Sequence, residues 1–268
     1  MQNSVTLPQW LDNLIFEKLG AKYCRSNSDM TVIDWDKNDI LNYLGTYFPR
    51  SYTESYCIFR EFFHNYPNQF EKKEEISVFD FGCGTGGEII GFLTALSEFN
   101  QKIKKIRIVA LDGNPHALKL YDKVLESFKT QTLLCVESLS AQVCIDDFYD
   151  LNILNSVIKK KFDAIITFKA ICEFVTKQQF ENKNAYEYIA NVLLPKLTPC
   201  GLLLFVDVTT YNNISSEWLP KMMDKGLFAA NCNVIARNDG YNQSFVIRHS
   251  RNNNDVSKVA WRMIRNNI

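Results

Sequence analysis

The sequence lacks a net charge, a signal-peptide pattern and any apolar run long enough to cross a membrane. Thirty basic residues balance thirty acidic ones among 268 residues, so the formal net charge is zero. This balance argues against a protein-wide electrostatic grip on nucleic acid, and the sequence has no strong nucleic-acid signature. The N-terminus has no basic segment followed by an apolar run. We therefore expect a protein that has no membrane anchor.

Paired cysteines are also missing. The eight cysteines are scattered singly, with no C-x-x-C pair and no metal-ligand spacing to the three histidines. Cys135, Cys144 and Cys172 lie in apolar runs, where a reduced thiol behaves as a small buried hydrophobe. These features predict a cytoplasmic protein without a metal site or a disulfide framework.

What the sequence does have is enough apolar material for a packed core. Hydrophobic residues make up 46% of the chain and aromatic residues 13%. We divide the chain into an N-terminal helical cap, residues 1–75, and an α/β domain, residues 76–268. Within the cap, the apolar spacing predicts helices over 10–20, 36–45 and 50–65.

The third cap helix carries a broad aromatic face, and this face has two interpretations. Aromatic residues at helical spacing usually pack in a core, which is the reading we favour for most of them. The alternative is a lid over the ligand, with Arg50, Tyr52 or Tyr56 turned inward. In both cases the cap is expected on the substrate side of the α/β domain.

Beyond residue 76, apolar strands alternate with helical segments, as in a doubly wound, Rossmann-like sheet. The third strand is ambiguous, because 141–145 either extends or replaces 132–136. A turn at 238–240 between two strands is typical of a hairpin. The expected strands are 77–81, 106–111, 132–136, 162–167, 202–207, 233–237 and 244–248, and the expected helices start near 87, 115, 181 and 218.

The chain is organised around a glycine-rich stretch, Val78-Phe79-Asp80-Phe81-Gly82-Cys83-Gly84-Thr85-Gly86-Gly87. It predicts a strand, an acidic residue, a tight turn and the start of a helix. Glycines let the backbone approach a ligand closely, because no Cβ intervenes. The N–H groups of such a turn and of the following helix suit an anionic or strongly polar ligand.

Together with Asp80, the glycines at 82, 84 and 86 resemble the first motif of class I S-adenosylmethionine-dependent methyltransferases, and the likeness covers roughly residues 76–248. The resemblance implies a seven-stranded sheet with an antiparallel final strand from the C-terminal hairpin. It also implies S-adenosylmethionine as cofactor, with its ammonium near Asp80 and its ribose hydroxyls on Asp112. By the same resemblance, Asp146 or Asp147 lies near the adenine, with Glu137 as an alternative if the strand ends at Val136. The full set implied to bind the cofactor is Asp80, Gly82, Cys83, Gly84, Gly86, Asp112, Gly113, Asp146, Asp147 and Phe168.

Residues that follow the fourth and fifth strands are expected to line the acceptor pocket, because ligands lie beyond the carboxyl ends of such strands. Lys169, Glu173 and Asp207 are the candidates for a catalytic role there. Each could also have a purely structural role. Lys169 or Glu173 would then be a surface charge or part of an ion pair, and Asp207 would hold the loop in place. We expect SN2 transfer to an acceptor of undetermined class, with a small molecule or protein slightly favoured over RNA.

Two other functions remain open at the level of sequence. Gly82, Gly84 and Gly87 also fit G-x-G-x-x-G, the dinucleotide fingerprint of NAD(P)-dependent oxidoreductases. A shorter likeness, through 47–52 and 170–174, is to methyltransferase-like proteins associated with the small ribosomal subunit. That likeness suggests an rRNA methyltransferase or a non-catalytic assembly factor. The acceptor and the oligomeric state are not specified.

Overall fold

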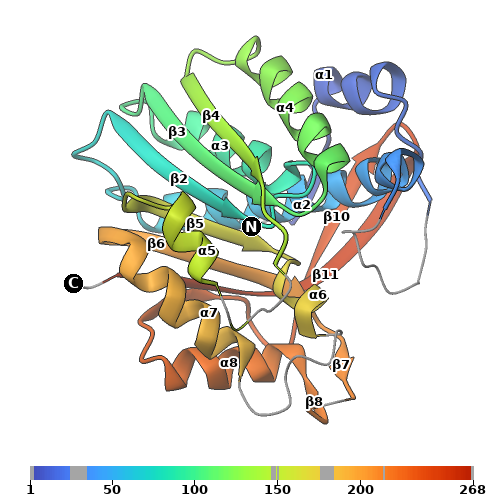
Figure 1. Cartoon of the computed structure of the whole chain (residues 1–268). Helices are drawn as coiled ribbons and strands as arrows, with labels where there is room; N and C mark the ends of the chain where they lie inside the picture. Colours follow the sequence, from blue (N-terminus) through green and yellow to red (C-terminus); the bar gives the residue numbers. More distant parts are fainter. Residues whose placement is uncertain are drawn as a thin grey trace. The chain divides into compact units, whose positions relative to one another are not determined.

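The computed structural model describes residues 3–24, 35–145, 149, 151–175, 184–213 and 215–266 (Figure 1). The chain divides into two compact units, each built from several segments. The first contains Met1–Glu75, Cys83–Gln142 and Ser244–Ser257. The second contains Ile76–Gly82, Val143–Gln243 and Lys258–Ile268.

The first unit begins with a strand that the sequence did not predict. Strand β1 (Ser4–Thr6) pairs in parallel with β10 (Gln243–His249). Three residues are too few to show a period-2 pattern, so this strand could not be recognised from its sequence. The expected helix over 10–20 is present as α1 (Gln9–Asp12) followed by the π-helix η1 (Asn13–Lys18).

Helix α2 (Lys37–Asn65) replaces the two cap helices that we predicted over 36–45 and 50–65. A helix stop was expected at Gly45 and a new start after Pro49, but Pro49 lies inside the helix. An internal proline removes one backbone hydrogen bond and costs about 3 kcal/mol. Burial of Phe48, Tyr52 and other apolar side chains of this helix, at about 1.5–3 kcal/mol each, outweighs that cost.

Gly45 does not end the helix; it is the point where the backbone around Lys22 lies close against α2. A Cβ there would lie 2.4 Å from the carbonyl oxygen of Lys22. The backbone N–H of Lys22 donates a 3.1 Å hydrogen bond to the carbonyl of Leu41. The start of the helix agrees with the sequence, because Asp36 caps it in a capping box with Asp39.

Helix α3 (Gly87–Phe99) begins at the predicted residue and packs on α2 through two glycines (Figure 1). A Cβ at Gly87 would lie 2.5 Å from the carbonyl oxygen of Phe48, and one at Gly91 would lie 2.4 Å from that of Tyr52. The glycines are four residues apart and therefore share one helix face. They let the two helix backbones come into direct contact.

In the first unit, strand β3 (Lys105–Asp112) is followed by helix α4 (Pro115–Lys129). Proline stands at the start of this helix, as predicted. Strand β4 (Cys135–Gln142) pairs in parallel with β3 along its whole length. The expected strand over 132–136 was therefore placed too early. Glu137 lies inside the strand, which rules out the alternative in which it follows the strand end.

The second unit holds four strands in the order β2 (Glu75–Phe81), β5 (Phe162–Phe168), β6 (Leu197–Val208) and β11 (Asn252–Arg265). β2 and β6 pair in parallel with β5, and β11 runs antiparallel to β6. The implied antiparallel strand is present, but it lies beyond residue 248, where the sequence analysis placed no element.

The predicted hairpin over 233–248 was wrong. Strand β9 (Val234–Arg237) pairs antiparallel with β11, and β10 is also a neighbour of β11 in the strand order. β9 and β10 therefore share one long partner strand. Short strands on either side of an Asp-Gly turn favour a hairpin locally, and the 14-residue β11 outcompetes that pairing.

The second unit also contains α5 (Asn152–Val157), α6 (Ile171–Val175), α7 (Ala185–Leu193) and α8 (Leu219–Ala229). Helices α7 and α8 pack side by side, and α8 contacts β6 (Figure 1). The helix predicted over 181–197 is shorter, because the side chain of Asn184 caps it and β6 begins at Leu197. Residues 181–183 lie outside the described part of the chain. The remaining elements are η3 (Leu194–Lys196), β7 (Tyr211–Asn212) and β8 (Glu217–Trp218).

These elements confirm a mixed α/β fold whose sheet pairing is mostly parallel. Among the described strands, β2, β3, β4, β5, β6, β9 and β10 correspond to the seven expected ones, and β1, β7, β8 and β11 are additional. Two cysteines differ from expectation, because Cys135 and Cys144 are exposed. Among the described helices, none combines the length and apolar character that a membrane crossing requires.

Candidate functional site

The glycine turn follows β2, and the boundary between the two units falls within it, after Gly82. Gly82, Gly84 and Gly86 have φ angles of 73°, 47° and 85°. Only glycine adopts this left-handed region without steric cost. The spacing of the three glycines in the sequence therefore reflects a backbone path that other residues would strain.

In the first unit, the N–H groups of the turn are already used within the protein. Cys83 N–H donates to the carbonyl of Leu111 at 2.9 Å, and Gly86 N–H donates to the carbonyl of Cys83 at 2.8 Å. Gly84 N–H donates to Oδ2 of Asp112 at 2.8 Å. These three groups are therefore bonded, contrary to our expectation that the turn exposes its N–H groups to a ligand.

Asp112 ends β3 and links the glycine turn to the start of α4. Its Oδ1 accepts the N–H of Asn114 at 2.8 Å, and the side chain of Asn114 caps the helix. The carboxyl group is half-buried, and burial raises its pKa, opposed by the N–H groups of Asn114 and Gly84. The neighbouring Gly113 is also half-buried, and its carbonyl accepts Nε2 of Gln142 at 3.1 Å.

Two aromatic side chains crowd the turn. A Cβ at Gly84 would lie 2.9 Å from the hydroxyl oxygen of Tyr43, which α2 supplies. A Cβ at Gly86 would lie 2.6 Å from the ring of Tyr121, which α4 supplies. Both glycines are thus required by their neighbours as well as by their φ angles. Cys83 is fully buried beneath the turn.

In the second unit, Asp80 is buried near the end of β2, in register with Ile166 of β5. Gly82 lies against the segment that follows β5, since a Cβ there would be 2.4 Å from Cβ of Ala170. Phe168, the last residue of β5, is buried and pairs with Val206 of β6. The structure thus brings the first glycine of the motif next to the segment predicted to line the acceptor pocket.

Lys169 turns the chain between β5 and α6. Its φ angle of 55° is unusual for a residue with a side chain. The turn is held by its N–H, which donates to the carbonyl of Val206 at 2.8 Å, and by its carbonyl, which accepts the thiol of Cys172 at 3.1 Å. Its side chain is half-buried. Strained backbone of this kind is commonly found at functional sites.

Asp207, near the end of β6, is surrounded by hydrogen-bond donors. Oδ2 accepts the hydroxyl of Tyr186 at 2.8 Å and the N–H of Cys172 at 3.0 Å, and Oδ1 accepts the N–H of Val208 at 2.9 Å. Its side chain is buried, and burial raises the pKa of the carboxyl group. Of the two roles considered for Asp207, this geometry favours a tie that fixes the turn at Lys169.

Cys172 and Glu173 lie in α6, directly after the turn at Lys169. Burial raises the pKa of the Cys172 thiol well above its ordinary value, so this thiol is protonated and unreactive. Glu173 is half-buried in α6, and its N–H donates to the carbonyl of Ala170 at 3.3 Å. Asp146 and Asp147, predicted near the adenine, lie outside the described residues.

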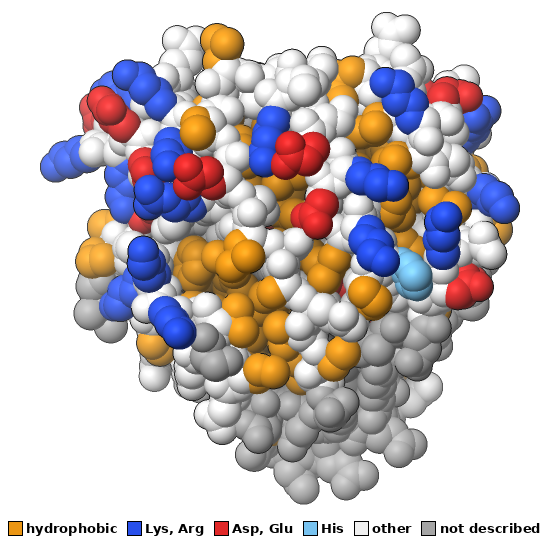
Figure 2. Space-filling model, turned by 45° about the horizontal axis from the view of Figure 1, so that its top comes forward, with side chains coloured by type: hydrophobic (Ala, Val, Ile, Leu, Met, Phe, Trp, Pro, Cys, Tyr) orange, Lys and Arg blue, Asp and Glu red, His pale blue; other side chains and the backbone are white. Residues whose placement is uncertain are grey.

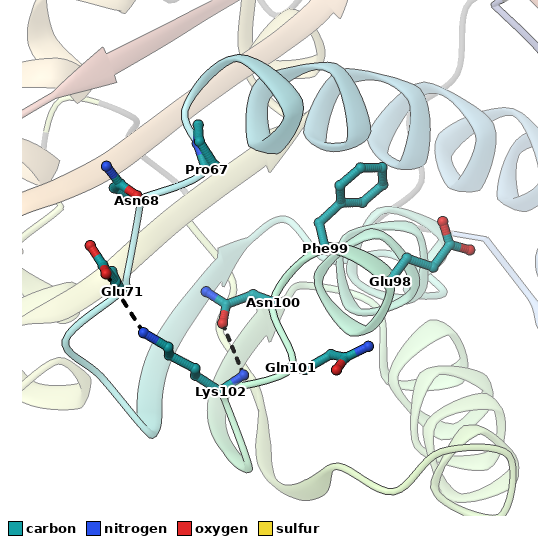
Figure 3. A pocket seen from close by; sticks show the side chains of 8 residues that line it. All are labelled: Pro67, Asn68, Glu71, Glu98, Phe99, Asn100, Gln101 and Lys102. Atoms are coloured by element: carbon teal, nitrogen blue, oxygen red, sulfur yellow. Dashed lines mark hydrogen bonds and ion pairs between the residues drawn. The ribbon is translucent and has the colours of Figure 1, made fainter.

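A surface cavity of about 480 Å³ lies at the C-terminal ends of α2 and α3 (Figure 3). Its side chains include Glu71 and Lys102, which form an ion pair at 3.6 Å, and Glu98, which accepts the hydroxyl of Tyr56. The glycine turn lies at the other end of α3, about 20 Å away for a helix of this length. The cavity contains none of the predicted site residues.

No protein family model and no curated protein matches the sequence. The structure is similar to several solved methyltransferases at low identity. One is magnesium protoporphyrin IX methyltransferase from Synechocystis with bound S-adenosylmethionine, with 9% identity and a TM-score of 0.46, covering 95% of this chain and 89% of that one. Another is an S-adenosylmethionine-dependent methyltransferase from Clostridium acetobutylicum, with 13% identity and a TM-score of 0.45, covering 79% and 91%. An rRNA methyltransferase from Streptomyces viridochromogenes has 12% identity and a TM-score of 0.45, covering 79% and 85%.

Among the described residues, no cluster of three or more histidine, cysteine, aspartate or glutamate side chains is arranged to hold a metal. Sequence reasoning missed three residues that contact the predicted candidates or the glycine turn: Tyr43, Asn114 and Tyr186. Asn114 was visible as a residue before proline, a usual helix cap. Tyr43 was hidden by the false helix end at Gly45, and nothing local indicated that Tyr186 reaches Asp207.

Proposed function

We propose that the protein is an S-adenosylmethionine-dependent methyltransferase. The observation that carries the proposal is the 2.8 Å bond from Gly84 N–H to Asp112, which joins the glycine turn to the acidic end of β3. The glycine motif and the acidic residue at the end of the next strand are the first two features that the resemblance to the class I family rests on. Here a hydrogen bond joins them directly. The antiparallel pairing of β11 with β6 adds support, because the resemblance implied such a strand.

The residues present fit the cofactor. Oδ2 of Asp112 accepts the N–H of Gly84 and Oδ1 accepts that of Asn114, and a carboxylate has about four lone-pair sites, so this group can also accept a ribose hydroxyl. The left-handed glycines leave no Cβ over the turn. Asp80 is assigned to the ammonium end, by the same resemblance, and Asp146 or Asp147 to the adenine. When bound, the sulfonium supplies an activated methyl group.

On the acceptor side, we assign positioning rather than proton transfer to Asp207. Its carboxyl group is buried and accepts hydrogen bonds from Tyr186 and from two backbone N–H groups, which suits a bracing role better than that of a base. Lys169 and Glu173 are half-buried and so keep part of their surface exposed. They are proposed to orient the acceptor for in-line attack.

The dinucleotide alternative fits less well. In a dinucleotide fold, the pyrophosphate approaches the glycine loop and the first turn of the next helix. Here the N–H groups of Gly84 and Gly86 are bonded within the protein.

A small molecule or a protein is the proposed acceptor class. The face shown in Figure 2 carries acidic and basic side chains next to one another. The first unit also contains surface ion pairs, such as Lys105 with Glu137 at 2.6 Å and Arg107 with Glu75 at 2.5 Å. A long nucleic acid favours a continuous basic surface instead.

Incubation of the pure protein with radiolabelled S-adenosylmethionine and fractionated cell extract tests the activity. We expect label in one fraction, and the chemistry of that fraction names the acceptor class. Label in ribosomal RNA would overturn the proposed acceptor class but would still support methyl transfer from S-adenosylmethionine. Cofactor binding without label in any fraction would favour the non-catalytic assembly factor.

A further inference from the structure

We propose that Tyr43 of α2 contacts the adenosine half of the bound cofactor and forms the cap-side wall of its site. This inference rests on the function proposed above and adds a residue to it. From the sequence, Arg50, Tyr52 and Tyr56 were the alternative candidates for such a contact. In the structure Tyr52 is buried and Tyr56 bonds to Glu98, so these two side chains serve packing and a surface hydrogen bond.

Tyr43 belongs to an aromatic row along one face of α2. Residues 43, 47 and 50 follow the i, i+4, i+7 pattern that places side chains on one side of a helix. The rings of Tyr43 and Tyr47 stack with centroids 5.2 Å apart, and the guanidinium of Arg50 lies 5.5 Å from the centre of the Tyr47 ring. Arg50 is in turn fixed by two hydrogen bonds to Asp255, at 2.8 and 2.9 Å. The row therefore holds the Tyr43 ring in place.

The row ends at the glycine turn. The Tyr43 hydroxyl lies 2.9 Å from the position that a Cβ of Gly84 would occupy. Gly84 donates its N–H to Asp112, the residue assigned to the ribose. Tyr43 and the ribose-binding carboxylate thus flank the same buried glycine.

A second set of contacts connects Tyr43 to Asp112 from the other side. Asp112 accepts the N–H of Asn114, and Nδ2 of Asn114 donates to the carbonyl of Trp35 at 3.1 Å. The Trp35 ring packs edge-on against Tyr43, with centroids 5.8 Å apart. The contacts therefore close a circuit: Gly84, Asp112, Asn114, Trp35, Tyr43 and back to Gly84.

The exposure of these residues is what a ligand site requires. Gly84 and Asn114 are buried and form the rigid part of the circuit, whereas Trp35, Tyr43 and Asp112 each keep part of their surface exposed. Two aromatic rings and one carboxylate match a ligand with a flat heteroaromatic base and a vicinal diol. The adenosine half of the cofactor has both features, and its methionine half has neither.

Binding of three ligands to the wild type and to Tyr43→Ala tests the inference. The ligands are S-adenosylmethionine, S-adenosylhomocysteine and 5′-methylthioadenosine, measured by calorimetry. We expect the variant to bind all three about tenfold more weakly, the effect of losing one aromatic contact. Tyr43→Leu, which keeps apolar bulk against Gly84, serves if the alanine variant does not fold, and we expect a similar loss.

Tyr56→Ala is the matched control, because Tyr56 lies further along the same helix, where its hydroxyl bonds to Glu98 near the C-terminal end of α3. Its affinities should equal those of the wild type. Trp35 supplies a readout independent of activity: ligand should change the tryptophan emission of the wild type, and the change should be lost in Trp35→Phe.

The outcomes separate the two proposals. A wild type that binds none of the three ligands contradicts the proposed function itself. A wild type that binds them, with Tyr43 variants of equal affinity, overturns only the role of Tyr43. A loss confined to S-adenosylmethionine would place Tyr43 at the sulfonium and overturn the adenosine assignment.

Discussion

The hydroxyl of Tyr186 donates a 2.8 Å hydrogen bond to Oδ2 of Asp207, and both side chains are buried. The same carboxyl oxygen accepts the N–H of Cys172, so one residue of β6 connects α7 to the turn that follows β5. That turn lies against Gly82, the first glycine of the motif. Asp207 thus braces the turn after β5 through the backbone N–H of Cys172.

Replacement of Asp207 by asparagine should change how stability depends on pH. Burial raises the pKa of Asp207 above 3.8 in the folded state, so the folded protein holds this proton at a pH where the unfolded chain has released it. The stability of the wild type relative to Asp207→Asn should therefore fall as the pH rises from about 4. Urea unfolding of both proteins between pH 3.5 and 7 measures this difference. Parallel curves would show that the carboxyl group does not titrate differently on folding.

Loss of the Arg50–Asp255 pair should destabilise the first unit. Arg50 makes two hydrogen bonds to Asp255, whose side chain is 1% exposed. Arg50→Met leaves that carboxylate buried without its partner, and we expect a loss of about 3 kcal/mol in the free energy of unfolding. A double variant with Asp255→Leu should recover most of the loss, because both charges are then gone. A double variant as unstable as the single one would contradict this account.

Gly91→Ala should destabilise the protein although alanine favours helices. Its Cβ would lie 2.4 Å from the carbonyl oxygen of Tyr52, so α2 and α3 must separate. We expect a net loss of about 1–3 kcal/mol, larger than the gain of about 1 kcal/mol in helix propensity. Gly240→Ala is a useful comparison, since φ is 65° there but no atom lies within 4 Å of the new Cβ. Thermal unfolding of both variants shows whether the close contact, or only backbone strain, decides the cost.

Asp112→Ala should weaken cofactor binding by about 1–3 kcal/mol, through the loss of charge-assisted hydrogen bonds to the ribose. It also removes the acceptor for Gly84 N–H, so a small loss of stability should accompany it. Asp112→Asn keeps one oxygen, so its affinity for the cofactor should lie between that of the wild type and that of Asp112→Ala. Binding is measured by calorimetry at a temperature where circular dichroism shows each variant folded. An unchanged dissociation constant in the folded alanine variant would exclude the ribose role.

The alternation of strands and helices was predictable from the sequence, because buried parallel strands are continuous apolar runs and α4 is marked by Asn114 and Pro115. The glycine turn was equally visible, since left-handed backbone at Gly82, Gly84 and Gly86 admits little else. Helix α2 was not predictable as one continuous helix. Gly45 and Pro49 usually end a helix, but here the packing of the helix outweighs their cost.

Long-range partners account for the other errors. The pairing of β9 with β11 depends on a strand that begins 15 residues after β9 ends, at Asn252. The role of Asp207 depends on Tyr186 and Cys172, which the fold alone brings to it. The sequence was therefore enough to name candidate residues. Whether a candidate such as Asp207 binds a ligand or braces the backbone could be decided only from its side-chain contacts.

A calorimetric titration of the wild-type protein with S-adenosylmethionine, S-adenosylhomocysteine, NAD and NADP decides which cofactor the glycine turn serves. We expect one saturable site for S-adenosylmethionine and its demethylated product, and no binding of either dinucleotide. Binding of NAD or NADP without binding of S-adenosylmethionine would contradict this expectation.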